Sequence, residues 1–195
     1  MNWEEWYSKE DPWGIRKNKL VLKRAKEMKK LINKIKLGGL FFDGGCGEGF
    51  ITDVIFRDLG VRFIGLDISR KALKRAKRLE VYQDVIQGDI SQLPFKDETF
   101  DFVLLSESIY YVKNWKLCLD EAKRILKENG YVLVSVALGK NYLGYWEVNR
   151  EFKKRFSLLA KKIVGTSMLR TFAKILINHP HYAKYLLLGQ KVSRA

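Results

Sequence analysis

One stretch of the sequence decides the fold, and it reads Phe41-Phe42-Asp43-Gly44-Gly45-Cys46-Gly47-Glu48-Gly49-Phe50. Glycine holds four of the six positions from 44 to 49, after a short apolar strand and before a predicted helix. Glycine lets a backbone turn with positive φ and approach a ligand closely. The start of a helix offers unpaired N–H groups and the positive end of the helix dipole. The stretch therefore predicts a strand, a ligand-binding loop and a helix in succession.

Two common phosphate-binding loops do not fit this stretch. The dinucleotide fingerprint G-x-G-x-x-G fails in both registers, because Phe50 holds the third glycine position in one and Cys46 the second in the other. The phosphate loop G-x-x-x-x-G-K-[ST] fails because no lysine follows Gly49. Asp43 opens the loop, and its carboxylate would repel a pyrophosphate and attract a cation. The loop thus favours a cationic ligand.

The pattern around the loop alternates short apolar strands with amphipathic helices. We expect strands over 40–42, 61–66, 85–86, 102–105 and 131–138, and helices over 16–36, 50–59, 69–79 and 115–127. This alternation predicts an α/β fold with a doubly wound, mostly parallel, Rossmann-like sheet and helices on both faces. Beyond Gly139 we expect basic helices over 147–163 and 167–177 and a last strand over 185–192. The short remainder leaves open that one terminal strand is absent.

Five motifs follow one another along the predicted strands: the loop at 43–49, Gly65-Leu66-Asp67-Ile68-Ser69, Gln87-Gly88-Asp89-Ile90-Ser91-Gln92-Leu93-Pro94-Phe95, and the segments 99–112 and 126–134. In this order they resemble the motifs of the class I S-adenosylmethionine-dependent methyltransferases, most closely the type 11 subgroup that is similar to the ubiquinone and menaquinone methyltransferases. The resemblance covers about residues 38–138. It implies the methyltransferase form of the Rossmann-like sheet and S-adenosylmethionine as the cofactor. It leaves the methyl acceptor open, because one fold hosts many substrates.

The aspartates at the predicted strand ends have chemistry that suits this cofactor. Asp67 can accept hydrogen bonds from both ribose hydroxyls, as an acid does in dinucleotide sites. Asp89 can accept from the adenine amino group, and the Ile90 N–H can meet a ring nitrogen. Asp43 and the loop backbone would frame the cationic methionine part. Each aspartate could instead form a turn or cap a helix. The expected cofactor-binding residues are Asp43, Gly45, Cys46, Gly47, Gly49, Asp67, Ile68, Asp89, Ile90 and Ser106.

Methyl transfer is a displacement that needs alignment of the acceptor and exclusion of water. A general base is needed only if the acceptor must lose a proton. The candidates follow the fourth predicted strand and are Glu107, Tyr110 and Tyr111. Tyr111 could instead pack over the cofactor. Many relatives carry histidine here, but this chain has only His179 and His181, and no Cys/His spacing suggests a metal site.

The positive charge of the chain is concentrated in two flanks. The formal net charge is +15, yet residues 37–140 hold 15 basic and 15 acidic side chains. Residues 16–36 hold ten basic side chains against one acid, and residues 141–195 hold eleven against two. Such flanks suggest an anionic partner, either RNA phosphates or an anionic membrane surface, although they could simply be solvated. We expect a small, anionic or lipid-like acceptor that is methylated on O, N or C. The alternatives are tRNA or rRNA methylation and a non-catalytic RNA- or partner-binding module.

The length of 195 residues predicts a single domain. We expect residues 1–36 to form an N-terminal lid with a basic helix, 37–140 the cofactor-binding core, and 141–195 basic helices and a last strand. Residues 1–36 and 141–181 would cover the acceptor pocket. Two cysteines, no basic-then-apolar leader and no long apolar run predict a reduced, cytoplasmic protein, and the sequence leaves its oligomeric state open.

Overall fold

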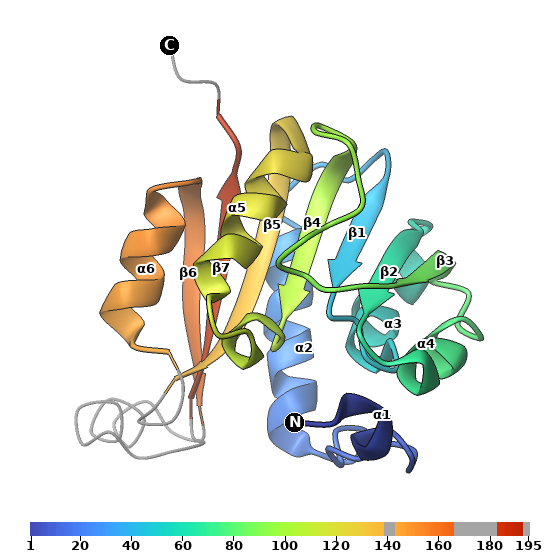
Figure 1. Ribbon diagram of the computed structural model, residues 1–195. Helices are drawn as coiled ribbons and strands as arrows, with labels where there is room; N and C mark the ends of the chain where they lie inside the picture. The colour runs from blue at the N-terminus through green and yellow to red at the C-terminus, as the bar shows by residue number, and fades with distance from the viewer. Residues whose placement is uncertain (139–142, 166–182, 193–195) are drawn as a thin grey trace.

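The computed structural model describes residues 1–138, 143–165 and 183–192 and contains one seven-stranded sheet of order β3-β2-β1-β4-β5-β7-β6 (Figure 1). The strands are β1 (Phe41–Gly44), β2 (Phe63–Asp67), β3 (Tyr82–Gln87), β4 (Phe100–Ser106), β5 (Leu126–Leu138), β6 (Ser157–Gly165) and β7 (Ala183–Gln190). Neighbouring strands from β3 to β5 are parallel, and β7 is antiparallel to both of its neighbours. The predicted doubly wound, mostly parallel α/β fold is confirmed.

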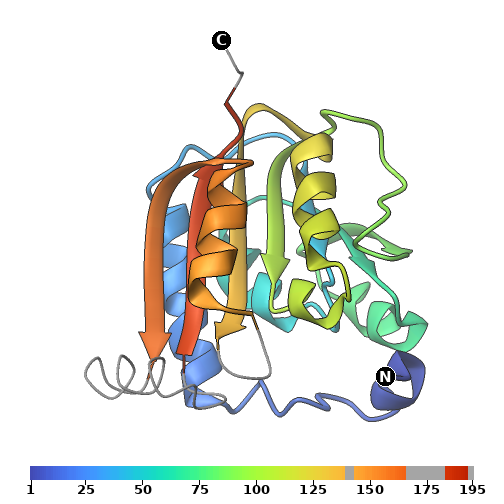
Figure 2. The same cartoon turned by 60° about the vertical axis from the view of Figure 1, so that its left-hand side comes forward.

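Helices cover both faces of the sheet (Figures 1 and 2). They are α1 (Trp3–Trp6), α2 (Lys19–Ile32), α3 (Phe50–Phe56), α4 (Arg70–Ala76), α5 (Trp115–Ile125) and α6 (Tyr145–Lys153), with 3-10 turns η1 (Arg57–Leu59) and η2 (Ile109–Tyr111). Side chains alternate between the two faces, as the period of a strand requires. On β4, Phe102 and Leu104 pack with α2 and α3, whereas Val103 and Leu105 pack with α5 and α6. Both faces of the sheet are therefore buried.

Local side-chain chemistry explains where the helices begin. The Asn18 side chain accepts hydrogen bonds at the start of α2, and the Ser69 hydroxyl accepts one from the Ala72 N–H at the start of α4. These groups satisfy N–H donors that a first helical turn leaves unpaired. The helix predicted over 69–79 thus begins as expected, with Ser69 as its cap, and ends at Ala76. Helix α2 ends at Ile32, earlier than the predicted residue 36, and no helix of the described ranges is long and apolar enough to cross a bilayer.

The expectation of one helix over 147–163 is wrong in its second half. Helix α6 ends at Lys153, and the chain continues as the edge strand β6. Leu158 and Ala160 are half-buried while Leu159 between them is exposed, which is the period of a strand. Lysines 161 and 162 then lie on the open edge of the sheet, where charge discourages further strand pairing. With β6 at its edge the sheet has seven strands, so no terminal strand is missing.

The predicted helix over 167–177, together with His179 and His181, lies outside the described residues. The topology nevertheless places the site. Ligands of doubly wound sheets bind beyond the carboxyl ends of the strands, where the strand order reverses. Here that point lies between β1 and β4, and Figure 1 draws α1 and the amino end of α2 near the same ends.

Candidate functional site

A cavity of about 800 Å³ lies at the carboxyl ends of the central strands. Ligand pockets typically fall between roughly 300 and 1,000 Å³. Every one of the site residues expected from the sequence lines it: Asp43, Gly45, Cys46, Gly47, Gly49, Asp67, Ile68, Asp89, Ile90, Ser106, Glu107, Tyr110 and Tyr111. The fold therefore brings the predicted residues together, although their individual roles stay predictions.

The glycine loop, residues 44–49, needs its glycines for space as well as for conformation. Gly45 and Gly47 have φ of +74° and +54°. A Cβ on Gly45 would lie 2.4 Å from the Cβ of Ser108, and one on Gly47 would lie 2.8 Å from the Tyr7 hydroxyl. A side chain at either position would therefore be strained and would also clash with the cavity wall.

Asp43 places a carboxylate in the floor of the cavity. The Asp43 side chain is fully buried. Its Oδ2 accepts hydrogen bonds from the Thr52 hydroxyl at 2.5 Å and from the Tyr82 hydroxyl at 2.6 Å. Burial raises the pKa of Asp43 to about 6, and these two hydrogen bonds oppose the rise. At pH 7 the group is thus mostly ionised and can attract a cationic ligand.

Asp67 holds the glycine loop against the end of β2. Its Oδ2 accepts from the Gly47 N–H at 2.8 Å, and its Oδ1 accepts from the Ser69 N–H at 2.9 Å. Burial raises the pKa of Asp67, whereas these backbone hydrogen bonds lower it. Each carboxylate oxygen has a second lone pair, so Asp67 keeps the capacity to accept hydrogen bonds from a ligand.

Asp89 differs from the other two aspartates because it is exposed. Its Oδ1 accepts from the backbone N–H of Ser91 at 2.8 Å and from the Ser91 hydroxyl at 2.7 Å. The geometry is that of an aspartate that forms a turn, the alternative that the sequence left open. Ile90 beside it is buried and Ile68 is exposed, and both side chains offer apolar surface to the same cavity.

Glu107 is contacted by two cations and two hydroxyl groups. Arg24 lies 3.1 Å away and Lys184 donates to its carboxylate, as do the hydroxyls of Ser135 at 2.6 Å and Tyr110 at 2.9 Å. Burial alone would raise the pKa of Glu107, but the charges of Arg24 and Lys184 outweigh it and lower the pKa to about 2. A base with so low a pKa accepts a proton poorly at pH 7.

The two tyrosines after β4 pack against each other, with ring centroids 4.5 Å apart, and each has further contacts of its own. The Tyr110 hydroxyl donates to Glu107, and burial followed by the nearby charge of Glu107 raises the pKa of Tyr110 well above its usual value. The Tyr111 ring instead packs edge-on against Trp3 at 5.1 Å and lies 5.7 Å from Trp13. With Trp6, which lies 4.8 Å from Trp13, these rings form an aromatic cluster at the cavity. The packing interpretation of Tyr111 therefore fits the structure better than a role as base.

Comparison with known proteins identifies the domain that carries these residues. A family model described as a methyltransferase domain matches residues 42–134. Residues 42–134 belong to the class I S-adenosylmethionine-dependent methyltransferases. The resemblance predicted from the five motifs is thereby confirmed.

Proteins similar to this chain are named for different activities. The chain is 27% identical over 162 residues to phthiotriol/phenolphthiotriol dimycocerosates methyltransferase 1 of Mycobacterium ulcerans, which covers 76% of this chain and 59% of that protein. It is 33% identical over 104 residues to the mitochondrial arginine-hydroxylase NDUFAF5 of Homo sapiens, covering 53% of this chain and 30% of that protein. The chain thus spans 30% to 59% of the length of these curated relatives.

A solved structure supports the fold over nearly the whole chain. The N-methyltransferase NodS of Bradyrhizobium japonicum, crystallised with S-adenosyl-L-homocysteine, superposes with a TM-score of 0.77 at 15% identity and covers 97% of this chain and 96% of that one. At this identity the likeness concerns the fold alone.

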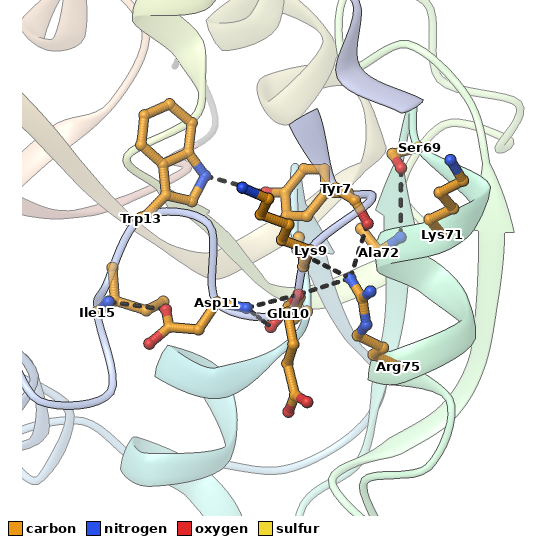
Figure 3. Close-up of polar contacts among 12 residues, drawn as sticks. Tyr7, Lys9, Glu10, Asp11, Trp13, Ile15, Ser69, Lys71, Ala72 and Arg75 are labelled. Carbon is orange, nitrogen blue, oxygen red and sulfur yellow. Dashed lines mark hydrogen bonds and ion pairs between the residues drawn. The ribbon is translucent and has the colours of Figure 1, made fainter. Parts of the chain in front are cut away.

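Polar contacts join residues 7–11, which precede the methyltransferase domain, to Arg75 of α4 (Figure 3). Arg75 Nη1 donates to the carbonyl oxygens of Tyr7 at 3.0 Å and Lys9 at 3.2 Å, and to the Glu48 carboxylate at 2.8 Å. That carboxylate also accepts from the Asp11 N–H at 3.1 Å. We call residues 7–11 with these contacts the N-terminal latch. It joins a segment outside the domain to the glycine loop.

Sequence reasoning missed three residues that shape the cavity: Tyr7, Arg24 and Lys184. Arg24 carried a usable signal. It stands on the apolar face of α2 with Val21 and Met28, where a charge is unexpected, and it is 3% exposed. Tyr7 carried no signal of its own. Lys184 carried none either, because only the pairing of β7 with β5 brings it to Glu107.

Proposed function

We propose that this protein transfers a methyl group from S-adenosylmethionine to an O, N or C nucleophile of a small molecule. The observation that carries the proposal is the pair of buried carboxylates, Asp43 and Asp67, on either side of the glycine loop in one large cavity. When bound, S-adenosylmethionine supplies a methyl group that its sulfonium already activates. The ammonium and sulfonium of that molecule are cationic, and the ionised Asp43 suits them.

The residues of the cavity fit this cofactor in three further respects. Asp67 retains lone pairs that would accept hydrogen bonds from ribose hydroxyls. Ile68 and Ile90 offer apolar surface that suits a flat base. Asp89 lines the same cavity, and its carboxylate would accept a hydrogen bond from an amino group of that base. The Ser106 hydroxyl is buried without a hydrogen-bond partner among the described residues, so a ligand can satisfy it.

The residues of this chain would contribute alignment and exclusion of water. The N-terminal latch and the aromatic cluster close the cavity beside the glycine loop. Holding two reactants in line can supply much of the rate of a displacement. Glu107 orients Tyr110 and two cations and does not need to move a proton. The proposed acceptor is therefore one whose nucleophile is already deprotonated, or loses its proton to water.

We propose a small acceptor with anionic or lipid-like character. Apolar and aromatic side chains line much of the cavity, which suits an apolar body. The name of one relative, a phthiotriol/phenolphthiotriol dimycocerosates methyltransferase, describes action on a lipid. Another relative is named an arginine-hydroxylase, so methyl transfer must be tested directly.

Calorimetry and labelled methyl transfer test the proposal together. S-adenosylmethionine should bind the intact chain, and Asp67→Ala should bind it at least about tenfold more weakly, because two charge-assisted hydrogen bonds are lost. Asp84→Ala is the matched control, since Asp84 lies on the exposed face of β3 and outside the cavity. Unchanged affinity of Asp67→Ala would remove that residue from the site.

The activity itself is tested by incubating the protein with a fractionated cell extract and S-adenosylmethionine labelled on the methyl group. Label should enter a small-molecule fraction, and its chemistry then identifies the acceptor. Label in RNA would replace the small acceptor with the RNA alternative. Cofactor binding without label in any fraction would favour a non-catalytic module.

A further inference from the structure

The exposed aromatic side chains of the described ranges gather at one end of the molecule. They are Trp6, Trp13, Tyr111 and Trp146, which are 37%, 37%, 40% and 79% exposed. Single exposed apolar side chains are ordinary on a protein surface, whereas a group of them marks an interaction site. The place where these four rings meet therefore indicates a face that contacts a partner.

Three exposed apolar side chains lie where the cavity opens to solvent. Trp13, Tyr111 and Leu117 all line the cavity, and Leu117, in the first turn of α5, is 42% exposed. Trp6 lies outside the cavity and packs against Trp13, with ring centroids 4.8 Å apart. The opening is thus bordered by apolar and aromatic surface.

Trp146 continues this surface onto the neighbouring helix. It stands in the first turn of α6, where Glu147 forms an ion pair with Lys116 of α5 at 3.2 Å. Figure 1 draws the amino ends of α5 and α6 at the same end of the sheet as α1. Trp6 and Trp146 do not line the cavity, so a ligand held inside it does not explain their exposure. We define the mouth rim as Trp6, Trp13, Tyr111, Leu117 and Trp146.

Unpaired lysines accompany the mouth rim. Lys113 lines the cavity, and Lys17 and Lys19 flank Asn18, which lines it as well. All three lysines are exposed, and none forms an ion pair with another residue of the described ranges. The formal net charge of the whole chain is +15. Aromatic rings settle at the head-group level of a bilayer, and lysines are attracted by anionic lipids. The rim and its lysines therefore match an anionic lipid surface.

We propose that the mouth rim docks on an anionic lipid bilayer, with the cavity opening towards the membrane. An acceptor with an apolar body can then enter the cavity without crossing water. That origin of the acceptor rests on the proposed function, whereas the docking itself does not. RNA is a less suitable partner, because single strands follow a continuous basic groove, whereas the lysines here are spread around an apolar opening.

Sedimentation with sucrose-loaded vesicles measures the docking without cofactor or acceptor. The intact protein should bind vesicles of phosphatidylcholine with about one third phosphatidylglycerol at least about tenfold more tightly than phosphatidylcholine alone, because the lysines meet lipid charge. Lipids brominated on the acyl chain should quench the tryptophan fluorescence of the bound protein, since the rings of the rim enter the bilayer interface.

Variants separate the mouth rim from the general positive charge. Trp146→Ala should weaken vesicle binding by about tenfold, because the most exposed ring no longer buries its apolar area. Leu117→Asp should weaken it at least about tenfold, because an acid would then enter the anionic surface. Leu159→Asp is the matched control, since Leu159 is 47% exposed but lies near the amino end of β6, away from the cavity; the expected loss is less than about twofold. Thermal unfolding shows whether each variant keeps the fold.

The other outcomes overturn the docking. Equal losses in Leu117→Asp and Leu159→Asp, or vesicle binding without quenching, would mean adsorption through net charge alone. RNA binding that Trp146→Ala weakens, without any vesicle binding, would assign the mouth rim to RNA instead. Calorimetry with S-adenosylmethionine is run in parallel, and Trp146→Ala should bind it with wild-type affinity. Failure of the intact chain to bind the cofactor refutes the proposed function, whereas failure with vesicles alone refutes the docking.

Discussion

Replacing Arg75 with methionine should open the N-terminal latch while the sheet stays folded. Arg75 Nη1 lies within hydrogen-bond distance of the oxygens of Tyr7, Lys9 and Glu48, yet it carries only two hydrogens. At most two of the three bonds can be well formed at once. Methionine keeps most of the apolar stem and removes these donors, so the change acts on the latch.

The expected magnitude follows from those contacts. Two hydrogen bonds from a charged donor contribute about 1.5 kcal/mol each at the lower end of their range. The Arg75 side chain is 24% exposed, which reduces the total, while Glu48 at 4% exposed loses a partner and increases it. We expect the latch to lose about 2–3 kcal/mol, so that its open form becomes roughly 30- to 150-fold more populated.

Two measurements follow the opening. Trypsin cleavage after Arg16 or Lys17 should accelerate, because the segment before them is no longer held. The dissociation constant for S-adenosylmethionine should rise at least about tenfold, since a site competent in only part of the molecules binds with reduced apparent affinity. Arg78→Met is the control, because the Arg78 side chain is exposed and forms no ion pair within the described ranges. Wild-type cleavage and affinity in Arg75→Met would refute the assignment of the latch.

Three further predictions concern the glycine loop, Asp43 and Glu107. Gly45→Ala should lower the free energy of unfolding by at least about 2 kcal/mol in urea titrations, because φ is +74° and the new Cβ would meet Ser108 at 2.4 Å; an unchanged midpoint would contradict the close approach. S-adenosylmethionine affinity should fall as the pH drops through about 6, where Asp43 loses its charge, and the dependence should vanish in Asp43→Asn. Folding stability depends on pH in the opposite direction. The raised pKa of Asp43 contributes stability that is fully present below its ordinary 3.8 and is lost as the pH rises through about 6. Glu107→Gln should lower the free energy of unfolding by about 3–5 kcal/mol at pH 7, because it leaves two cations uncompensated. The lowered pKa of Glu107 contributes stability above its ordinary 4.5, and this stability is lost as the pH falls towards about 2.

Much of the fold was predictable because local patterns agree with the final packing. The apolar runs of β1, β2, β4 and β5 are buried on both faces, as parallel strands are. The edge strand β6 was not predictable, because only one face of it is partly buried and its lysines lie on the open edge. A run with that composition also fits an amphipathic helix, and only pairing with β7 decides between the two.

The candidate site was predictable where its residues belong to strand ends and the glycine loop. Asp43 lies near the end of β1, Asp67 ends β2 and Asp89 follows β3, and a parallel sheet brings such positions to one edge. Their partners in the structure were not predictable. The turn at Asp89 and the hydrogen bonds of Asp43 with Tyr82 depend on side chains whose directions the sequence does not specify.

The ion pairs of Glu107 with Arg24 and Lys184 show why one wall of the cavity escapes a sequence argument. Glu107 lies 83 positions from Arg24 and 77 from Lys184 in the chain. Their meeting requires that β7 enter the sheet antiparallel beside β5, with β6 outside it. No periodicity of either segment encodes that order. The wall of the cavity made by the glycine loop and the ends of β1 and β2 thus follows from motifs within one continuous stretch, whereas the wall made by Arg24, Glu107 and Lys184 depends on contacts between the flanks and the core.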